Sequence, residues 1–524
     1  MNIVSRIHCT IMAFILSTSS MFGPGVATAI LLVSYILSIA FYRLFLSPLA
    51  KIPGPKLAAL TYWYECYYDV FRPAQYVFKI KELHRVYGPI IRITPAEVSI
   101  ADPDFVDAIY SPGPGQKRDK DIQKVKALGI NTSIGGAVAH DLHRHRREAL
   151  NPFFSHRSIT RLAPKMDDKV GQLEDLFLRA KESTEVVNLS DLYYGFANDI
   201  LNEYCFGRNE NLVSDKALAH AKRENVNGVL RAVKFNLHFS WVRDLMRRLP
   251  PSIGAKMTPP GIRDMIRFRI GIRKEIQAVV NQKTKGRDEG ATKSIFHELR
   301  DSSILPESEK SPQRLEDEAT LLVMAGTQST QLSLTMAHYH LLANPAIMAK
   351  LRTELASHPS STLIQLEQLP YLNGVIQEAH RLAFGLTGRN ARVSPDQPVD
   401  YTDLSTGHTY VIPSGTSIST STLLVHANED IFPDPFVFNP ERWLGSAGLV
   451  RRKYQLTFSK GPRTCIGMHL ANAEMAVAIA AMARWDMKLF ETENQDVEFL
   501  HDYHVATPKL DSKGVRVTVA SRVA

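Results

Sequence analysis

The 524-residue sequence predicts a mostly helical protein with a minor β component, preceded by one N-terminal transmembrane helix. Three observations support this class. An uncharged apolar stretch lies near the N-terminus, helical periodicity dominates from Leu142 to Leu382, and β-branched alternation occurs in two short regions. No Rossmann or P-loop glycine pattern and no internal repeat is visible, so neither a dinucleotide-binding fold nor a repeat architecture is indicated.

The N-terminal region resembles a membrane anchor. No Asp, Glu, Lys or Arg occurs from Cys9 to Tyr42, and a helix over residues 25–42 would extend about 27 Å, close to a bilayer's hydrocarbon thickness. Lys and Arg are more frequent after this stretch than before it, which places the rest of the chain in the cytosol. A cleaved signal peptide is the alternative, although the apolar run continues past the small residues of GVATA.

Four segments follow from this pattern. We expect an N-terminal segment at residues 1–24, the anchor at 25–42, a proline-rich hinge at 43–60 and a catalytic domain at 61–524. The prolines of KIPGPK in the hinge fix the backbone and cannot continue a helix, so the connector is stiff.

The elements of the body follow from local pattern. His84–Pro103 predicts a strand pair, and Val187–Gly207 predicts a helix that opens on a cap-type Asn or Ser and ends on Gly. Lys283–Arg314 is polar and indicates an exposed linker or a short helix with loops. Asp396–Ser421 predicts strands with Gly and Pro turns, and Ala471–Trp485 predicts a buried helix.

Composition and cysteine spacing limit the kinds of site. The formal charge of +9 is modest and spread along the chain, so it indicates no nucleic acid partner; it equally suits a basic docking surface for an acidic protein or for lipid headgroups. The four cysteines, Cys9, Cys66, Cys205 and Cys465, are too far apart for zinc or iron–sulfur spacing. Buried, unreactive cysteines are common in proteins, so composition alone favours a packing role for Cys465.

The first candidate motif is AGTQST, in the middle of the helix predicted over Leu315–Leu342. Glycine inside a helix costs about 1 kcal/mol relative to alanine, so Gly326 indicates close approach of a ligand or another backbone. Hydroxyls such as Ser329 and Thr330 lie beside it. Helix packing, with hydroxyls bonded to carbonyls four residues back, explains the motif equally well.

Two further motifs place charges at regular spacing. Glu378 and Arg381, in QEAHR, lie at i and i+3 and can pair, although the same spacing recurs at Glu82 and Arg85. Arg442, in DPFVFNPERW, can complete a charge cluster with Glu378 and Arg381. Breaking such a cluster, if it is buried, costs about 3–5 kcal/mol.

The fourth motif, FSKGPRTCIG, surrounds Cys465 with residues that suit a metal-bound thiolate. Gly461 and Gly467 permit tight turns and close approach. Peptide N–H groups can donate to the sulfur, Phe458 can shield it from water, and Arg463 can meet an anionic group. Matches at so many positions in order are improbable by chance.

In this order and spacing, AGTQST, EAHR, FNPERW and FSKGPRTCIG resemble the oxygen-binding helix, the Glu–Arg pair, its third member and the haem loop of the cytochrome P450 family. The resemblance extends from the anchor nearly to the C-terminus and implies the cytochrome P450 fold. The anchor and KIPGPK are similar to membrane-bound, reductase-dependent members. HRHRREALNPFFS and RLAFGLTGRNARVSP resemble fungal enzymes of secondary metabolism, of the trichodiene oxygenase kind.

The resemblance implies haem b with Cys465 as its axial thiolate, which favours O–O cleavage. Arg463 and Arg147 match positions that bind haem propionates, and Arg392 is a further candidate. Glu378, Arg381 and Arg442 are expected to hold the fold of the haem loop.

The family likeness also implies partners. NADPH is used indirectly, through an NADPH–cytochrome P450 reductase that docks on a basic face, with cytochrome b5 as a second candidate. Arg144, Arg146 and Arg147 are candidates for that face, although a solvated helix surface explains Arg144 equally well. The expected location is the endoplasmic reticulum membrane, with a single pass and a cytosolic catalytic domain.

Two departures from the family pattern concern proton delivery and propionate binding. Gln328 and Ser329 stand where the family has an acid followed by threonine. Gln cannot pass a proton by changing charge, so we expect delivery through Ser329 and water, and Thr330 is rotated about 100° away. His143 stands where tryptophan is frequent near a propionate, and it can make the same hydrogen bond.

The leading hypothesis is a mono-oxygenase that inserts one oxygen atom from O₂ into a lipophilic small molecule. The alternatives are a haem-thiolate enzyme of desaturation, rearrangement or dehydration, and a non-catalytic haem-binding sensor. Segments 117–139 and 205–241 are expected to line the pocket. A terpenoid or polyketide substrate follows only from the subfamily likeness.

Overall fold

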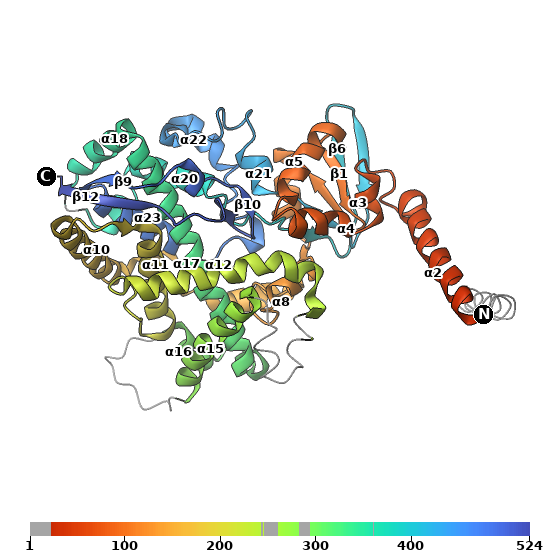
Figure 1. Cartoon of the computed structure of the whole chain (residues 1–524), viewed down its shortest axis with the longest axis horizontal. Coiled ribbons are helices and arrows are strands. Elements are labelled where there is room, and N and C mark those ends of the chain that lie inside the picture. The colour runs from red at the N-terminus through yellow and green to blue at the C-terminus, as the bar shows by residue number, and fades with distance from the viewer. Residues whose placement is uncertain (1–22, 243–244, 246–259, 282–293, 360, 524) are drawn as a thin grey trace.

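The computed structural model describes residues 23–242, 245, 260–281, 294–359 and 361–523. Helices hold 58% of the residues and strands 10%, which confirms the mostly helical class with a minor β component. Figure 1 shows a large helical region, a smaller region that holds β1, β6 and α3 to α5, and a single helix, α2, that extends away from both.

The helices within these ranges vary from single turns to one of 32 residues. In chain order they are α2 Gly23–Phe41, α3 Lys56–Leu60, α4 Trp63–Cys66, α5 Tyr76–Tyr87, α6 Val106–Tyr110, α7 Ile122–Leu128, α8 His140–Leu150, α9 His156–Thr160, α10 Ala163–Ser183, α11 Leu189–Phe206, α12 Lys216–His238, α15 Pro260–Asn281, α16 Ile295–Arg300, α17 Pro312–Ala343, α18 Pro345–Ala356, α19 Leu363–Leu366, α20 Pro370–Leu382, α21 Thr422–His426, α22 Gly445–Arg452 and α23 Met468–Met482.

The strands form four small sheets. A five-stranded sheet has the order β1-β2-β8-β5-β3, a three-stranded sheet has the order β4-β12-β9, and β6-β7 and β10-β11 are hairpins. Their bounds are β1 Ile90–Thr94, β2 Glu97–Ile100, β3 Asp119–Lys120, β4 Val187–Asn188, β5 Arg392–Val393, β6 Val399–Asp403, β7 His408–Ile412, β8 Ser417–Ser419, β9 Trp485–Leu489, β10 His501–Asp502, β11 Ala506–Thr507 and β12 Arg516–Arg522. Within the five-stranded sheet, only β2 and β8 run parallel.

The N-terminal apolar helix confirms the expected anchor as a candidate membrane span. The span covers Gly25–Leu46, and by length and composition it can cross a bilayer. It exposes large side chains such as Leu32, Ile36 and Phe45, which have no partner surface on the body to cover them. Most of the expected segment 1–24, and with it the start of the signal-peptide alternative, lies outside the described residues.

Several expected elements are confirmed. β1 and β2 form the predicted pair, with Ile90 opposite Ile100. The side chain of Asn188 accepts hydrogen bonds from the backbone N–H groups of Ser190 and Asp191 and so caps α11, which ends at Gly207. The predicted strands of Asp396–Ser421 are β6, β7 and β8.

One boundary was wrong. The helix predicted over Ala471–Trp485 ends at Met482, and the fully buried Trp485 instead opens β9, opposite Arg522 of β12.

Of the two structures predicted for Lys283–Arg314, the described part has the second, a short helix with loops. Residues 282–293 lie outside the described residues. The short helix is α16, in which Ile295 and Phe296 are fully buried, so this part is not an exposed linker.

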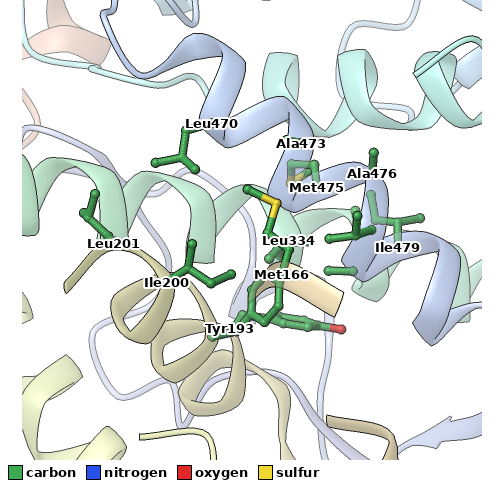
Figure 2. Close-up of a cluster of buried hydrophobic side chains, with 14 of the residues drawn as sticks. Met166, Tyr193, Ile200, Leu201, Leu334, Leu470, Ala473, Met475, Ala476 and Ile479 are labelled. Atoms are coloured by element: carbon green, nitrogen blue, oxygen red, sulfur yellow. The ribbon is translucent and has the colours of Figure 1, made fainter. Parts of the chain in front are cut away.

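The core of the helical region surrounds α17. Figure 2 shows Tyr193, Ile200 and Leu201 of α11 with Leu334 of α17 and a row of α23 side chains. Met475, Ala473 and Ile479 of α23 are fully buried there. Burial of this apolar surface fixes α17 and α23 relative to each other, and these two helices carry or flank the residues of the candidate site.

Candidate active site

A cavity of about 410 Å³ lies between α17, the loop that carries Cys465, α12 and the turn of β10-β11. Both segments expected to line a pocket do so, with Val125 and Leu128 from the first and Leu230 and Val233 from the second. Two further segments were missed from the sequence. The first is residues 385–392, after α20, and the second is His504 with Val505. No local sequence pattern predicted that either segment would line the cavity.

The Cys465 loop has the tight geometry that its motif indicated. The backbone N–H of Cys465 donates to the carbonyl of Phe458 at 2.8 Å. Gly461 has φ +68°, and a Cβ there would lie 2.1 Å from the carbonyl oxygen of Tyr110, so no other residue fits. Gly467 has an ordinary φ of −86°, so the expectation that it needs glycine's freedom to turn was wrong.

The sulfur of Cys465 faces the cavity. Burial raises the pKa of the Cys465 thiol, whereas a hydrogen bond from the Gly467 backbone and the charge of Arg147 act in the opposite direction. Phe458 also lines the cavity, and its ring meets His380 edge-on at 4.9 Å. Cys66 and Cys205 are buried and do not line the cavity, so Cys465 is the cavity's cysteine among the described residues.

Three of the cations that line the same cavity are Arg392 and Arg463, which are buried, and Lys120, which is half-buried. Strand pairing places Lys120 of β3 directly opposite Arg392 of β5, an arrangement that is destabilising for like charges. Arg463 donates to the carbonyls of Ala137 and Val138, and Lys120 donates to that of Gly135. None of the three cations forms an ion pair with a described residue.

Burial and mutual repulsion make these charges costly. Burial lowers the pKa of Lys120 to about 7, with Arg392 and Arg463 acting in the same direction. Burial also lowers the pKa of Arg463 to about 10 and lowers that of Arg392. An anionic ligand in the cavity would relieve this strain. Lys120 was not predicted, because its role appears only when β3 pairs with β5.

The basic residues Arg147, His143 and Arg146 of α8 have different surroundings. Arg147 donates to the carbonyl of Thr464 at 2.6 Å, next to Cys465, and burial lowers the pKa of its guanidinium. His143 is buried, and burial with nearby cations lowers its pKa to about 3. The assignment of Arg146 to an exposed docking face was wrong, because it is buried and paired with Glu309 at 2.8 Å.

The predicted charge cluster forms and is buried. Glu378 pairs with Arg381 at 2.7 Å and with Arg442 at 3.2 Å, and neither Glu378 nor Arg381 is accessible to solvent. The indole N–H of Trp443 donates to Glu378 at 2.9 Å. Sequence reasoning did not find Trp443, although it directly follows Arg442 in the quoted motif. The backbone N–H of Asn439 also donates to Glu378, at 3.0 Å.

The AGTQST motif serves both of its proposed roles. A Cβ on Gly326 would lie 2.7 Å from a methyl group of Leu201, so this glycine permits close packing of α17 on α11. Gly326 and Ser329 also line the cavity, and the Ser329 hydroxyl donates to the Ala325 carbonyl at 2.7 Å. The amide of Gln328 donates to Asn227 of α12 at 3.2 Å.

A carboxyl group not predicted from the sequence lies beside the motif. Glu474 of α23 is fully buried near Thr330, and neither of its oxygens has a good hydrogen-bond partner. Burial raises the pKa of Glu474 well above its ordinary value, and the Thr330 hydroxyl opposes this only weakly. Burial therefore favours the protonated form of the Glu474 carboxyl.

Comparison with known proteins identifies the class to which this fold and site belong. Residues 61–509 match the family Cytochrome P450. The chain is 38% identical to "Cytochrome P450 monooxygenase tpcC" of Cochliobolus heterostrophus over 504 residues, which cover 93% of this chain and 95% of that protein. It is 36% identical to "Cytochrome P450 monooxygenase TRI4" of Fusarium sporotrichioides, with 91% of each chain covered.

Solved structures share the fold. The cytochrome P450 CYP102L1 superposes with a TM-score of 0.66 at 18% identity, covering 86% of this chain and 95% of that one. The cyanobacterial CYP120A1 superposes with a TM-score of 0.64 at 22% identity, covering 84% and 93%. This chain belongs to the cytochrome P450 family, and it is a P450 monooxygenase related to fungal members of the family.

The residues present fit the haem with a cysteine thiolate ligand that this family implies. Among the described residues, the cavity holds one accessible cysteine and three cations without carboxylate partners, of which Arg392 and Arg463 are buried and Lys120 is half-buried. A porphyrin carries two propionates, which would neutralise such cations, and its iron takes a thiolate ligand. Membership of the family also implies a redox partner and a lipophilic substrate.

Proposed function

We propose that this protein inserts one oxygen atom from O₂ into a neutral or weakly polar fungal secondary metabolite, a terpenoid or polyketide. The observation that carries the proposal is the Cys465 loop at the floor of an apolar cavity, in a chain similar to fungal P450 monooxygenases. When bound, haem supplies the activation of dioxygen. The protein's own residues hold the cofactor, exclude water and deliver protons.

Each predicted site residue has a place in this proposal. Cys465 is the thiolate ligand, and Arg463, Arg392 and Lys120 hold the propionates, supported by their lack of other anionic partners. Arg147 is a less direct propionate contact, since it bonds to the Thr464 carbonyl and does not itself line the cavity. The cluster of Glu378, Arg381 and Arg442 supports the loop from outside the cavity. Phe458 and Gly467 flank the sulfur.

Electrons come from NADPH through a cytochrome P450 reductase, with cytochrome b5 as a second donor, on a basic face next to the Cys465 loop. Arg144 of α8 is exposed and can belong to that face. The span Gly25–Leu46 anchors the protein in the endoplasmic reticulum membrane, and Arg43, Lys51 and Lys56 keep the catalytic domain cytosolic.

Proton delivery is proposed to run through the Ser329 hydroxyl and water. Ser329, Thr330 and Ser333 of α17 all line the cavity; Ser329 is the exposed residue of the three, whereas Thr330 and Ser333 are buried and Thr330 lies beside Glu474. Gln328 orients hydrogen bonds but does not release a proton.

Ser329→Ala tests this role. Because a misdirected proton uncouples oxygen activation from product formation, we expect several-fold more hydrogen peroxide per NADPH consumed. Thr353→Ala on α18 is the control, since Thr353 makes the same kind of bond to a carbonyl four residues back, at 3.0 Å, away from the cavity. Equal coupling in both variants would remove Ser329 from proton delivery.

The function itself is tested with membranes that contain the protein and a reductase, supplied with NADPH, source-cell metabolites and isotopically heavy dioxygen. Mass analysis should find a product with one heavy oxygen atom. A haem-dependent product without the label would instead establish the second candidate, desaturation, rearrangement or dehydration, which the replacement of the acid by Gln328 favours. Reductase that fails to reduce the haem iron would indicate a non-catalytic haem-binding protein.

A further inference from the structure

The turn of β10-β11 places a histidine in the wall of the catalytic cavity. His504 and Val505 line the cavity, whereas the preceding residue, Tyr503, faces a separate small cavity on the other side of the turn. His504 is half-buried, and it retains accessible surface where it borders the cavity. His504 lies 39 residues after Cys465 along the chain (504 − 465), so only folding brings this side chain to the site.

The backbone holds His504 in a conformation that few residues adopt. Its φ is +74°, in the left-handed region. The carboxylate of Asp502 accepts from the His504 backbone N–H at 3.2 Å, from the Thr387 hydroxyl at 2.6 Å and from the Lys234 ammonium at 2.7 Å. The carbonyl of His504 accepts from the Thr387 backbone N–H at 3.1 Å. Because α12 and the segment after α20 both anchor the turn, the unusual conformation is stable and the ring is preorganised.

The imidazole itself has space but no partner. It packs on Gly388, where a Cβ would lie 3.3 Å from its Nδ1 atom. No described side chain or backbone group hydrogen-bonds to the ring. Burial lowers the pKa of His504 to about 4, and the charges of Lys234 and Lys120 act in the same direction while Asp502 opposes them. The ring is therefore neutral at neutral pH, with one donor and one acceptor.

Apolar side chains and paired charges make up much of the cavity near this turn. Leu230, Val233 and Leu386 line the cavity. The ammonium of Lys234 is neutralised by Asp502 and by Asp69 at 3.2 Å, and Arg389 is paired with Glu65. Lys234 and Arg389 therefore offer no uncompensated charge to an ionised substrate, whereas the His504 ring is a neutral polar group without a partner. Gln328 Oε1 and Thr420 Oγ1, in the same cavity, also lack hydrogen-bond partners, and leaving a polar group unpaired on burial is destabilising.

We propose that His504 is a specificity-determining residue that selects a neutral lipophilic substrate carrying a hydroxyl group, which exchanges a hydrogen bond with the imidazole. This deepens the proposed function and rests on it. The substrate is then not a bare hydrocarbon. The hydroxyl group comes from an earlier reaction: for a terpenoid, a hydroxylation or a cyclisation that ends by capture of water; for a polyketide, reduction or enolisation of a carbonyl group.

Matched probes test the proposal in the full-length, haem-loaded protein. The probes are pairs of terpenoids in which the alcohol is the hydrocarbon with water added across one double bond, such as cedrene with cedrol and bisabolene with bisabolol, together with cedryl methyl ether, which accepts but cannot donate. Dissociation constants are measured from the change in haem absorbance on binding and, independently, by equilibrium dialysis. At least one alcohol should bind about fivefold or more tightly than its hydrocarbon.

Variants at His504 distinguish an effect of the imidazole ring from an effect of the unusual backbone conformation. His504→Gly removes the imidazole and suits the left-handed φ, so it should abolish the preference for the alcohol without unfolding the turn. His504→Asn tolerates the same φ and retains a donor and an acceptor, so it should keep part of the preference. Tyr503→Phe, in the same turn but facing away from the cavity, should retain all of it.

Each outcome either supports the proposed role of His504 or overturns it. If no alcohol in the panel binds more tightly than its hydrocarbon, or if His504→Gly keeps the preference, the proposal is overturned. If cedryl methyl ether binds as tightly as cedrol, His504 acts as the donor; if it binds like cedrene, His504 acts as the acceptor. Failure of the proposed function has a different signature, because the protein would then lack a thiolate-ligated haem spectrum or oxygenated products.

Discussion

At the scale of single residues, the site depends on groups whose neighbours leave them few alternatives. Gly461 combines a left-handed backbone with contact against the Tyr110 carbonyl, so both its φ and its missing side chain are needed. Glu474 is buried without good partners, so its surroundings favour the protonated carboxyl. Each of these residues makes a separate prediction.

Gly461→Ala should prevent correct formation of the Cys465 loop. The added Cβ would collide with the Tyr110 carbonyl, in addition to the left-handed cost of about 1–2 kcal/mol for a residue other than glycine. The fraction of purified protein that carries haem should fall severely. Gly407→Ala is the matched control, since Gly407 has φ +69° and open space around it. Equal haem loading of the two variants would contradict the steric argument.

Glu474→Gln should flatten the dependence of stability on pH. Burial raises the pKa of Glu474 in the folded state, so the native protein binds more protons than the unfolded chain above the ordinary carboxyl pKa of about 4.3, and its stability falls as pH rises. Thermal unfolding of the haem-loaded protein between pH 5 and pH 8 measures this. The wild type should lose more stability with pH than the variant does, whereas exposed Glu182→Gln should behave as the wild type. Parallel curves for Glu474→Gln and the wild type would show that Glu474 is ionised.

At the scale of elements, a buried ion cluster connects α20 to the segment that ends in Trp443. Both Arg381 and Arg442 depend on the single carboxylate of Glu378, and Trp443 and the Asn439 backbone also donate to it. The Arg381 guanidinium in addition donates to the carbonyls of His426 and Pro435. One carboxylate thus organises several segments around the Cys465 loop.

Glu378→Gln should therefore be strongly destabilising. It leaves two buried guanidinium groups without an anion, which costs about 3–5 kcal/mol. Denaturant unfolding monitored by helix content and by haem absorbance measures the loss. Glu441→Gln is the control. Glu441 directly precedes Arg442 in the sequence, but its carboxylate pairs with the exposed Lys350 on the surface. A loss no greater than that of Glu441→Gln would mean that the cluster is not a major support.

At the scale of the whole molecule, most of the candidate span extends away from the catalytic body, and its end joins the body through Arg43, whose carbonyl accepts from Arg92. α2 extends away from the rest of the chain in Figure 1, and its large side chains are exposed. The body has its own core around α17, to which the span contributes no residue. The core of the body is therefore built without α2, as the proposed role of the span as a membrane anchor requires.

Removal of residues 1–42 should leave a folded, haem-loaded body that has largely left the membrane fraction. Exposed aromatic side chains near the hinge, such as Trp63 and Phe71, are expected to retain some membrane affinity. Sedimentation with and without high salt, together with the haem spectrum, measures both effects. A truncated protein that fails to bind haem would show that the span also supports the fold.

Much of the fold and site was predictable where the chemistry is contiguous in sequence. The Cys465 loop, the pair of Glu378 and Arg381, and the apolar anchor are short patterns whose physics is local, and the strand pair β1-β2 and the cap of α11 are local as well. Arg146 shows the limit of such reasoning, because a basic residue on a helix can face either solvent or a buried carboxylate.

The sequence by itself determined the class of protein, its cysteine, its charge cluster and its candidate span, because each is encoded by residues close together in the chain. Only the tertiary structure decided that Lys120 lies opposite Arg392, that Glu474 is buried beside Thr330, and that His504 enters the cavity. Strand pairing, helix packing and a remote hairpin turn create these contacts. Their energies depend on burial and on partners that no local pattern reveals.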